Sequence, residues 1–146
     1  MSVPSRVEPL AESVAAAFDR VPEPRRFAAR LVFTAHSIPR ALAASCDYEA
    51  QLRETASLVA FPLGRPQWSL VYQSRSGPPS QPWLDPDIGD HLRALAVEGV
   101  KDVVVAPIGF TSDDIEVLYD LDLEAKSRAI GLGMSVLLIL YFWLIA

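Results

Sequence analysis

The chain has 146 residues and a mass of 16.0 kDa, and its composition of 51% hydrophobic and 21% charged residues is typical of one globular domain with a buried core. Its formal net charge of -5 and pI near 4.9 argue against a nucleic-acid partner, because nucleic-acid binders present a basic face. A single cysteine, Cys46, excludes an internal disulfide framework, and the N-terminal residues have no apolar signal segment, so we expect a reducing, cytoplasmic setting.

The first half of the chain predicts a helix, a strand and a second helix. Residues 7–21 carry apolar side chains at helical intervals, and the prolines of residues 22–26 interrupt that helix. Residues 27–37 form an apolar run that ends in polar residues, which is typical of a short buried strand. Residues 47–61 then predict a second amphipathic helix with Asp47 as its N-cap.

The second half of the chain repeats this alternation of strands and helices. Its expected elements are a strand over residues 68–74, an irregular loop over 75–87 with four prolines, a helix over 87–100 that closes near Gly99, a strand over 101–110 and a helix over 112–131. Strands separated by helices predict an α/β fold of three layers, with helices on both faces of a parallel sheet. We expect its parallel strands near residues 29–35, 68–73 and 102–107.

Ligands of parallel α/β sheets bind beyond the carboxyl ends of the strands. His36 ends the first expected strand, where an imidazole either binds a metal, accepts a proton or serves a structural role. Trp83 lies in the proline-rich loop and either anchors that loop or stacks on a flat ligand. We interpret His91, inside a helical pattern, and Cys46, which has no metal-ligand spacing around it, as structural.

Acidic residues recur along the last expected helix. Glu116, Asp120 and Glu124 are four residues apart, so they form a row of carboxylates along one side of that helix. Two interpretations are open, a solvated acidic face or a row of oxygen ligands for a divalent metal. The second has the advantage that a cation would offset the repulsion between like charges.

Three segments of the chain together resemble a known family. They are "LVFTAHSIP", "YQSRSGPPSQPWLDPDI" and "VVVAPIGFTSDDIEVLYDLDLEA", in that order and with helical spacers between them. They are similar to the C-terminal half of ferrochelatase, over about residues 6–134. The resemblance implies a chelatase-like lobe and an enzyme, a lyase that inserts ferrous iron into a porphyrin in haem biosynthesis.

The resemblance also implies roles for particular residues. His36 and Glu116 match the family's catalytic pair, which face each other across the porphyrin pocket. The implied metal-handling residues are His36, Glu116, Asp120 and Glu124, and the implied porphyrin-binding residues are Trp83, Ser74, Arg75 and Ser76. Asp114 stands where the family pattern has a histidine. A porphyrin must lose its N–H protons to accept Fe²⁺, so a base beside metal-handling carboxylates suits the reaction.

The implied reaction has a porphyrin and ferrous iron as substrates and no tightly bound cofactor, and the porphyrin is either protoporphyrin IX or coproporphyrin III. Because the family chain is longer, we expect a partner, which is either the N-terminal lobe absent from this chain or a second copy in a homodimer. Two alternatives are a single-lobe homodimeric cobalt or nickel chelatase and an inactive remnant that binds metal or haem.

The end of the chain departs from the family pattern. We expect a ferrochelatase-like domain over residues 1–133 and a hydrophobic tail over residues 134–146, in which Val136–Ala146 is an unbroken apolar run. Three interpretations are open: a membrane anchor, a buried strand and turn of the core, or a truncated or frame-shifted end. On the last interpretation, deleting Val136–Ala146 is expected to improve solubility.

Overall fold

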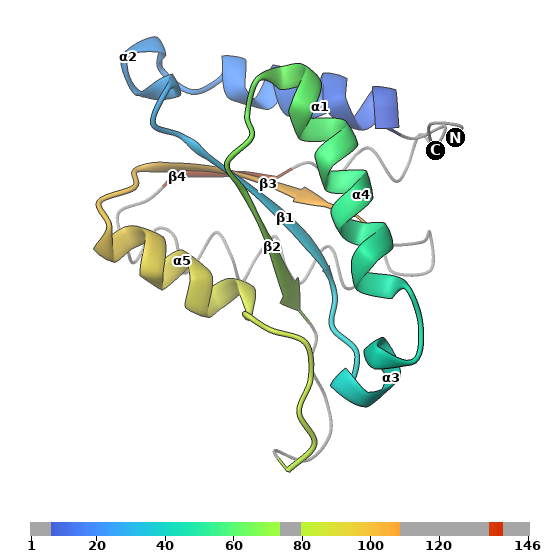
Figure 1. Ribbon diagram of the computed structural model, residues 1–146. Coiled ribbons are helices and arrows are strands. Elements are labelled where there is room, and N and C mark those ends of the chain that lie inside the picture. Colours follow the sequence, from blue (N-terminus) through green and yellow to red (C-terminus); the bar gives the residue numbers. More distant parts are fainter. Residues whose placement is uncertain (1–6, 74–79, 109–134, 139–146) are drawn as a thin grey trace.

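A computed structural model describes residues 7–73, 80–108 and 135–138 of the chain (Figure 1). Their elements, in chain order, are α1 (Val7–Asp19), α2 (Glu23–Arg26), β1 (Arg30–His36), α3 (Arg40–Ala44), α4 (Tyr48–Ala60), a 3-10 turn (Phe61–Leu63), β2 (Trp68–Gln73), α5 (Ile88–Val97), β3 (Asp102–Pro107) and β4 (Ser135–Leu138). None of the helices in this part of the chain is long and apolar enough to cross a membrane.

The four strands form one sheet in the order β2-β1-β3-β4, and every neighbouring pair is parallel. The parallel strands expected near residues 29–35, 68–73 and 102–107 are therefore confirmed, as is the α/β fold with helices on both faces. In the register of the sheet, His36 of β1 lies opposite Gln73 of β2, and Thr34 lies opposite Pro107 of β3. The carboxyl ends of β1, β2 and β3 therefore meet at one edge.

Alternating side chains of the strands supply two separate cores, because successive residues of a strand point to opposite faces. Leu31, Phe33 and Ala35 of β1 pack in the larger core, with residues of α1 and α4. Val32 of the same strand packs in the smaller core, with Leu92 and its neighbours on α5. Figure 1 shows the same layers, with α1 and α4 on one face of the sheet and α5 on the other.

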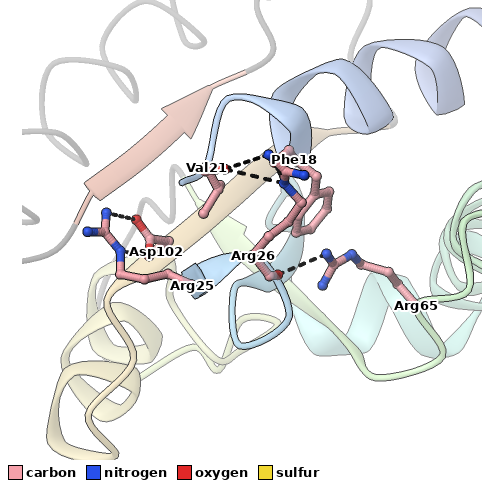
Figure 2. A network of polar contacts seen from close by, with 6 residues as sticks. All are labelled: Phe18, Val21, Arg25, Arg26, Arg65 and Asp102. Atoms are coloured by element: carbon pink, nitrogen blue, oxygen red, sulfur yellow. Dashed lines mark hydrogen bonds and ion pairs between the residues drawn. The ribbon is translucent and has the colours of Figure 1, made fainter. Parts of the chain in front are cut away.

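Arginines tie together the elements near the amino ends of the strands (Figure 2). The Arg26 guanidinium donates hydrogen bonds to the carbonyls of Phe18 and Val21, which lie at and just beyond the end of α1. Arg25 holds the carboxylate of Asp102 in a two-pronged ion pair, with N–O distances of 2.9 and 3.0 Å. Because Asp102 is buried, this pair satisfies a charge that would otherwise be left alone at the start of β3.

Short local elements differ from the expectation. The prolines do interrupt the first helix, but residues 23–26 form the helical turn α2, because a proline is tolerated in the first turn of a helix. The first strand begins at Arg30, and Phe27 lies outside it with 97% of its surface exposed. The turn α3 was not predicted. Asp47 does precede α4, yet its side chain makes no capping hydrogen bond.

The helix expected over residues 87–100 is confirmed as α5. Asp87 is its N-cap, and its carboxylate accepts a hydrogen bond from the Gly89 N–H at 2.8 Å. Gly99 follows the helix with a φ of 89°, a backbone conformation that favours glycine. Within the expected tail, residues 135–138 form β4 alongside β3, whereas residues 139–146 and the helix expected over residues 112–131 lie outside the described residues.

Candidate active site at the carboxyl edge of the sheet

His36 is the last residue of β1, a central strand, and it lies half-buried at the carboxyl edge. Its Nδ1 is 2.8 Å from the carbonyl oxygen of Ser37. A carbonyl can only accept a hydrogen bond, so Nδ1 must carry the proton in this contact. A neutral His36 therefore has its lone pair on Nε2, the form in which an imidazole acts as a base or as a metal ligand.

The start of α4 fixes the backbone around His36. The Tyr48 hydroxyl, from the first residue of that helix, donates to the His36 carbonyl at 2.8 Å. The Tyr72 hydroxyl donates to Glu49 Oε2 at 3.0 Å and so ties the same helical turn to β2. Burial, and after it the hydrogen bond to Glu49, raises the pKa of Tyr72, so its phenol remains a donor. These bonds hold the carboxyl ends of β1 and β2 in place beside α4.

A buried polar pair lies between β1 and β2 at this edge. The Thr34 hydroxyl donates to Gln73 Oε1 at 3.2 Å, and both residues are at least 96% buried. The other end of the carboxamide, Gln73 Nε2, is also buried and has no hydrogen-bond partner among residues 7–73, 80–108 and 135–138. Leaving a buried donor unpaired is costly, because the donor loses its hydrogen bonds to water on folding. We did not single out either residue from the sequence, although each interrupts an apolar strand with a polar side chain.

The loop that carries Trp83 lies against the chain leaving β1. Pro39 and Trp83 form an antiparallel bridge, and the Leu84 N–H donates to the Ile38 carbonyl at 2.9 Å. The buried Ser37 hydroxyl donates to the Leu84 carbonyl at 2.8 Å. The structure thus places Trp83 beside Pro39, in the segment that follows the last residue of β1, His36. The indole N–H of Trp83 is a second buried donor without a hydrogen-bond partner in the part of the chain that the structure describes.

The remaining predicted site residues lie outside the described part of the chain. They are Glu116, Asp120 and Glu124 of the acidic row, Asp114, and the loop residues Ser74, Arg75 and Ser76. The backbone leads toward both segments from this edge, because Gln73 ends β2 and the Ile108 N–H after β3 donates to the Thr34 carbonyl at 2.8 Å. No group of three or more His, Cys, Asp or Glu residues suited to a metal occurs within residues 7–73, 80–108 and 135–138.

His91 lies on α5, and Cys46 lies in the bend between α3 and α4. The Nε2 of His91 is buried with no hydrogen-bond partner from the described segments. Burial lowers the pKa of His91, the charge of Arg30 lowers it further, and Glu98 opposes the shift. This histidine therefore tends to stay neutral. Cys46 is an exposed thiol whose Sγ lies 3.4 Å from the carbonyl oxygen of Leu42.

Comparison with known proteins identifies the family. The family model described as Ferrochelatase matches residues 2–140. The chain is 48% identical over 136 residues to the coproporphyrin III ferrochelatase of Mycolicibacterium vanbaalenii, 49% over 140 residues to that of Nocardia farcinica, and 50% over 135 residues to that of Mycolicibacterium smegmatis. Each match covers 90 or 91% of this chain but only 40% of the relative, so the chain spans about two fifths of the length of these relatives. The chain belongs to the ferrochelatase family.

Proposed function

We propose that this chain forms part of a ferrochelatase that inserts Fe²⁺ into coproporphyrin III. Family membership supports the reaction, and the names of the relatives support this porphyrin in preference to protoporphyrin IX. Ferrous iron is a substrate of the proposed reaction, and no tightly bound cofactor is needed. We place the reaction in the cytoplasm, the setting that the single cysteine favours.

The observation that carries the proposal is the contact between His36 Nδ1 and the Ser37 carbonyl. Metallation replaces two pyrrole N–H protons of the porphyrin by one Fe²⁺, so two protons leave as the ion enters the ring. A base at the site therefore speeds the reaction, and an imidazole can accept and release protons near neutral pH. The contact from Nδ1 to the Ser37 carbonyl leaves the basic lone pair of the neutral ring on Nε2. In our proposal, Nε2 takes up pyrrole protons.

The other site residues receive roles by the same proposal. Glu116 faces His36 across the porphyrin as its catalytic partner, and Asp120 and Glu124 pass the cation toward it. Trp83 contacts the porphyrin together with Ser74, Arg75 and Ser76. The unpaired donors Gln73 Nε2 and Trp83 Nε1 support a bound substrate with oxygen acceptors at this edge, such as a porphyrin carboxylate.

The proposed activity needs more polypeptide than this chain supplies. The chain covers 40% of the length of each of the three relatives, and a porphyrin is large enough to require a second wall for its pocket. We propose that a further lobe of the ferrochelatase kind completes the site, and that a second copy of this chain is the alternative.

A chimera tests the proposal directly. Residues 2–140 of this chain would replace the matching segment of the Mycolicibacterium smegmatis relative, and anaerobic Fe²⁺ would be added to coproporphyrin III. We expect the porphyrin fluorescence to fall with time as the metal enters. A folded chimera that binds the porphyrin without metallating it would contradict the proposal.

The chain alone is the matched comparison for the chimera. Its mass in solution and its rates with Fe²⁺, Co²⁺ and Ni²⁺ would be measured under the same conditions. We expect little Fe²⁺ insertion by the isolated chain. An isolated dimer that inserts Co²⁺ or Ni²⁺ faster than the chimera inserts Fe²⁺ would instead favour a single-lobe chelatase.

A further inference from the structure

A groove lies at the amino edge of the sheet, at the opposite ends of the strands from His36. Its volume is about 480 Å³. Its walls come from α2 and the segment after it, the first residue of β1, Gln67 just before β2, and the segment between α5 and β3 with the first residue of β3. Figure 1 shows α2 and the end of α5 on this side of the molecule. The groove is therefore separate from the candidate active site, and its volume is within the range of small-molecule sites, which is roughly 300 to 1,000 Å³.

The groove carries an excess of positive charge. It is lined by three cations, Arg25, Arg30 and Lys101, and by two carboxylates, Glu98 and Asp102. Figure 2 shows how Asp102 is already taken by Arg25, in the two-pronged pair at 2.9 and 3.0 Å. Across the described residues, neither Arg30 nor Lys101 forms an ion pair. Positive charge is thus in excess here, although the whole chain has a formal net charge of -5.

The electrostatic influence of Arg30 is also seen at His91. The charge of Arg30 adds to burial in lowering the pKa of that imidazole, and Glu98 offsets it only in part. Arg30 and Glu98 thus act on this imidazole with opposite signs, and both residues also line the groove.

Apolar surface lies beside these cations. Phe27 lines the groove directly after α2, and 97% of its surface is exposed. Ala28 and Val100 also line the groove. An aromatic ring beside cations suits a ligand with an apolar body and a negative end.

We propose that the groove binds a small amphipathic anion, with a flat aromatic body against Phe27 and a carboxylate, sulfonate or phosphate group directed toward Arg30 and Lys101. Such a site goes beyond iron insertion, and its occupant does not take part in the proposed reaction at His36.

The fluorescent dye 8-anilinonaphthalene-1-sulfonate has this chemistry and would serve as the probe. The full chain would be titrated with it, together with the variants Phe27→Ala and Lys101→Glu. Both residues are exposed, so circular dichroism should show unchanged folds. We expect each variant to weaken the binding of the dye to the groove by about fivefold or more. Lys101→Gln should weaken it less than Lys101→Glu. Added salt should weaken it in the wild type.

Matched variants separate the groove from other apolar surface, such as the apolar run 136–146, which also attracts the dye. Phe61→Ala removes another exposed phenylalanine and Arg53→Gln another exposed cation, and both residues lie outside the groove lining. We expect neither to change the titration by more than about twofold. The uncharged dye N-phenyl-1-naphthylamine should not distinguish Lys101→Glu from the wild type. The groove proposal would be overturned if the groove and control variants weakened dye binding equally, or if neither groove variant weakened it. Neither result would bear on the proposed iron insertion.

Discussion

At the scale of single residues, the carboxyl edge combines a histidine of fixed orientation with two buried donors that lack acceptors among the described residues. The Ser37 carbonyl selects the tautomer of His36, and Tyr48 holds the backbone of the same residue. Gln73 Nε2 stays unpaired although Gln73 is only 4% exposed. Such a donor weakens the fold, and under the proposal a porphyrin carboxylate would accept its hydrogen bond.

The Thr34 and Gln73 pair gives a test that separates ligand binding from stability. Replacing both by apolar side chains of similar shape, in Thr34→Val with Gln73→Met, removes the bond and the unpaired donor together. We expect the free energy of unfolding to stay within about 1 kcal/mol of the wild type, because both partners are lost at once. Coproporphyrin III binding by the chimera should weaken about tenfold, as followed by fluorescence titration.

Thr34→Val alone is the control for this pair. It leaves Gln73 Oε1 without its donor, so it should cost about 1 to 3 kcal/mol in urea unfolding. If the double variant binds the porphyrin as well as the wild type does, the carboxamide is a packing defect and not a substrate contact.

His91 predicts a pH dependence of stability. Its pKa in the folded chain is lowered by burial and by Arg30, so the unfolded chain binds the proton more readily. The free energy of unfolding should therefore fall as the pH drops below the ordinary histidine pKa of 6.5. Urea unfolding at about pH 7.5 and about pH 5.5 should show a smaller decrease in His91→Gln than in the wild type. An equal decrease in both would show that His91 is not responsible.

At the scale of elements, the long regular ones could be predicted and the short ones could not. β1, β2 and β3 are buried runs rich in β-branched and aromatic residues, and α5 has both a capping Asp87 and a closing Gly99. α3 has only five residues, too few to show a helical period. In α2, a proline in the first turn looks like an interruption although it is compatible with a helix.

The candidate site, too, could be predicted from the sequence only in part. A histidine at the end of a strand can be placed at the ligand-binding edge by position alone. The bond between Thr34 and Gln73 depends on the register of two strands that are distant in the chain, and sequence periodicity does not give register. The antiparallel bridge between Pro39 and Trp83 also joins two distant segments, and the sequence does not reveal it.

The packing of α5 against the sheet predicts that alanine substitutions at different positions of this helix lower the free energy of unfolding by different amounts. Leu92 is 0% exposed and belongs to the core with Val32 and Val71, so Leu92→Ala should lower the free energy of unfolding by about 2 to 5 kcal/mol. Val97→Ala, at an 89% exposed position of the same helix, should change it by less than about 0.5 kcal/mol. Urea unfolding followed by circular dichroism measures both, and similar costs would contradict the packing of α5 described here.

At the scale of the whole molecule, the two edges of the sheet have different chemistry. The carboxyl edge presents His36 and, within the described residues, two buried donors without partners. The amino edge is tied by arginines and has a cationic groove. The family match extends over residues 2–140 and so includes β4. The resemblance noted from three segments of the sequence is thereby confirmed at the level of the family.

β4 changes what we expect from shortening the chain. Val136, Leu137 and Leu138 pair with β3, so a deletion that starts at Val136 removes an outer strand of the sheet. A deletion that starts after Leu138 keeps β4. We expect the first to lower the melting temperature clearly more than the second, as measured by circular dichroism. Equal melting temperatures would mean that β4 adds nothing to the stability of the sheet.

The most direct test of the account is the rate at which the chimera metallates coproporphyrin III when His36 is replaced. We predict that His36→Ala lowers the initial rate by about a hundredfold or more, because it removes the proposed base. His91→Gln, the matched change at the other histidine, should stay within about threefold of the wild type. A folded His36→Ala chimera that metallates the porphyrin as fast as the wild type would contradict the central claim.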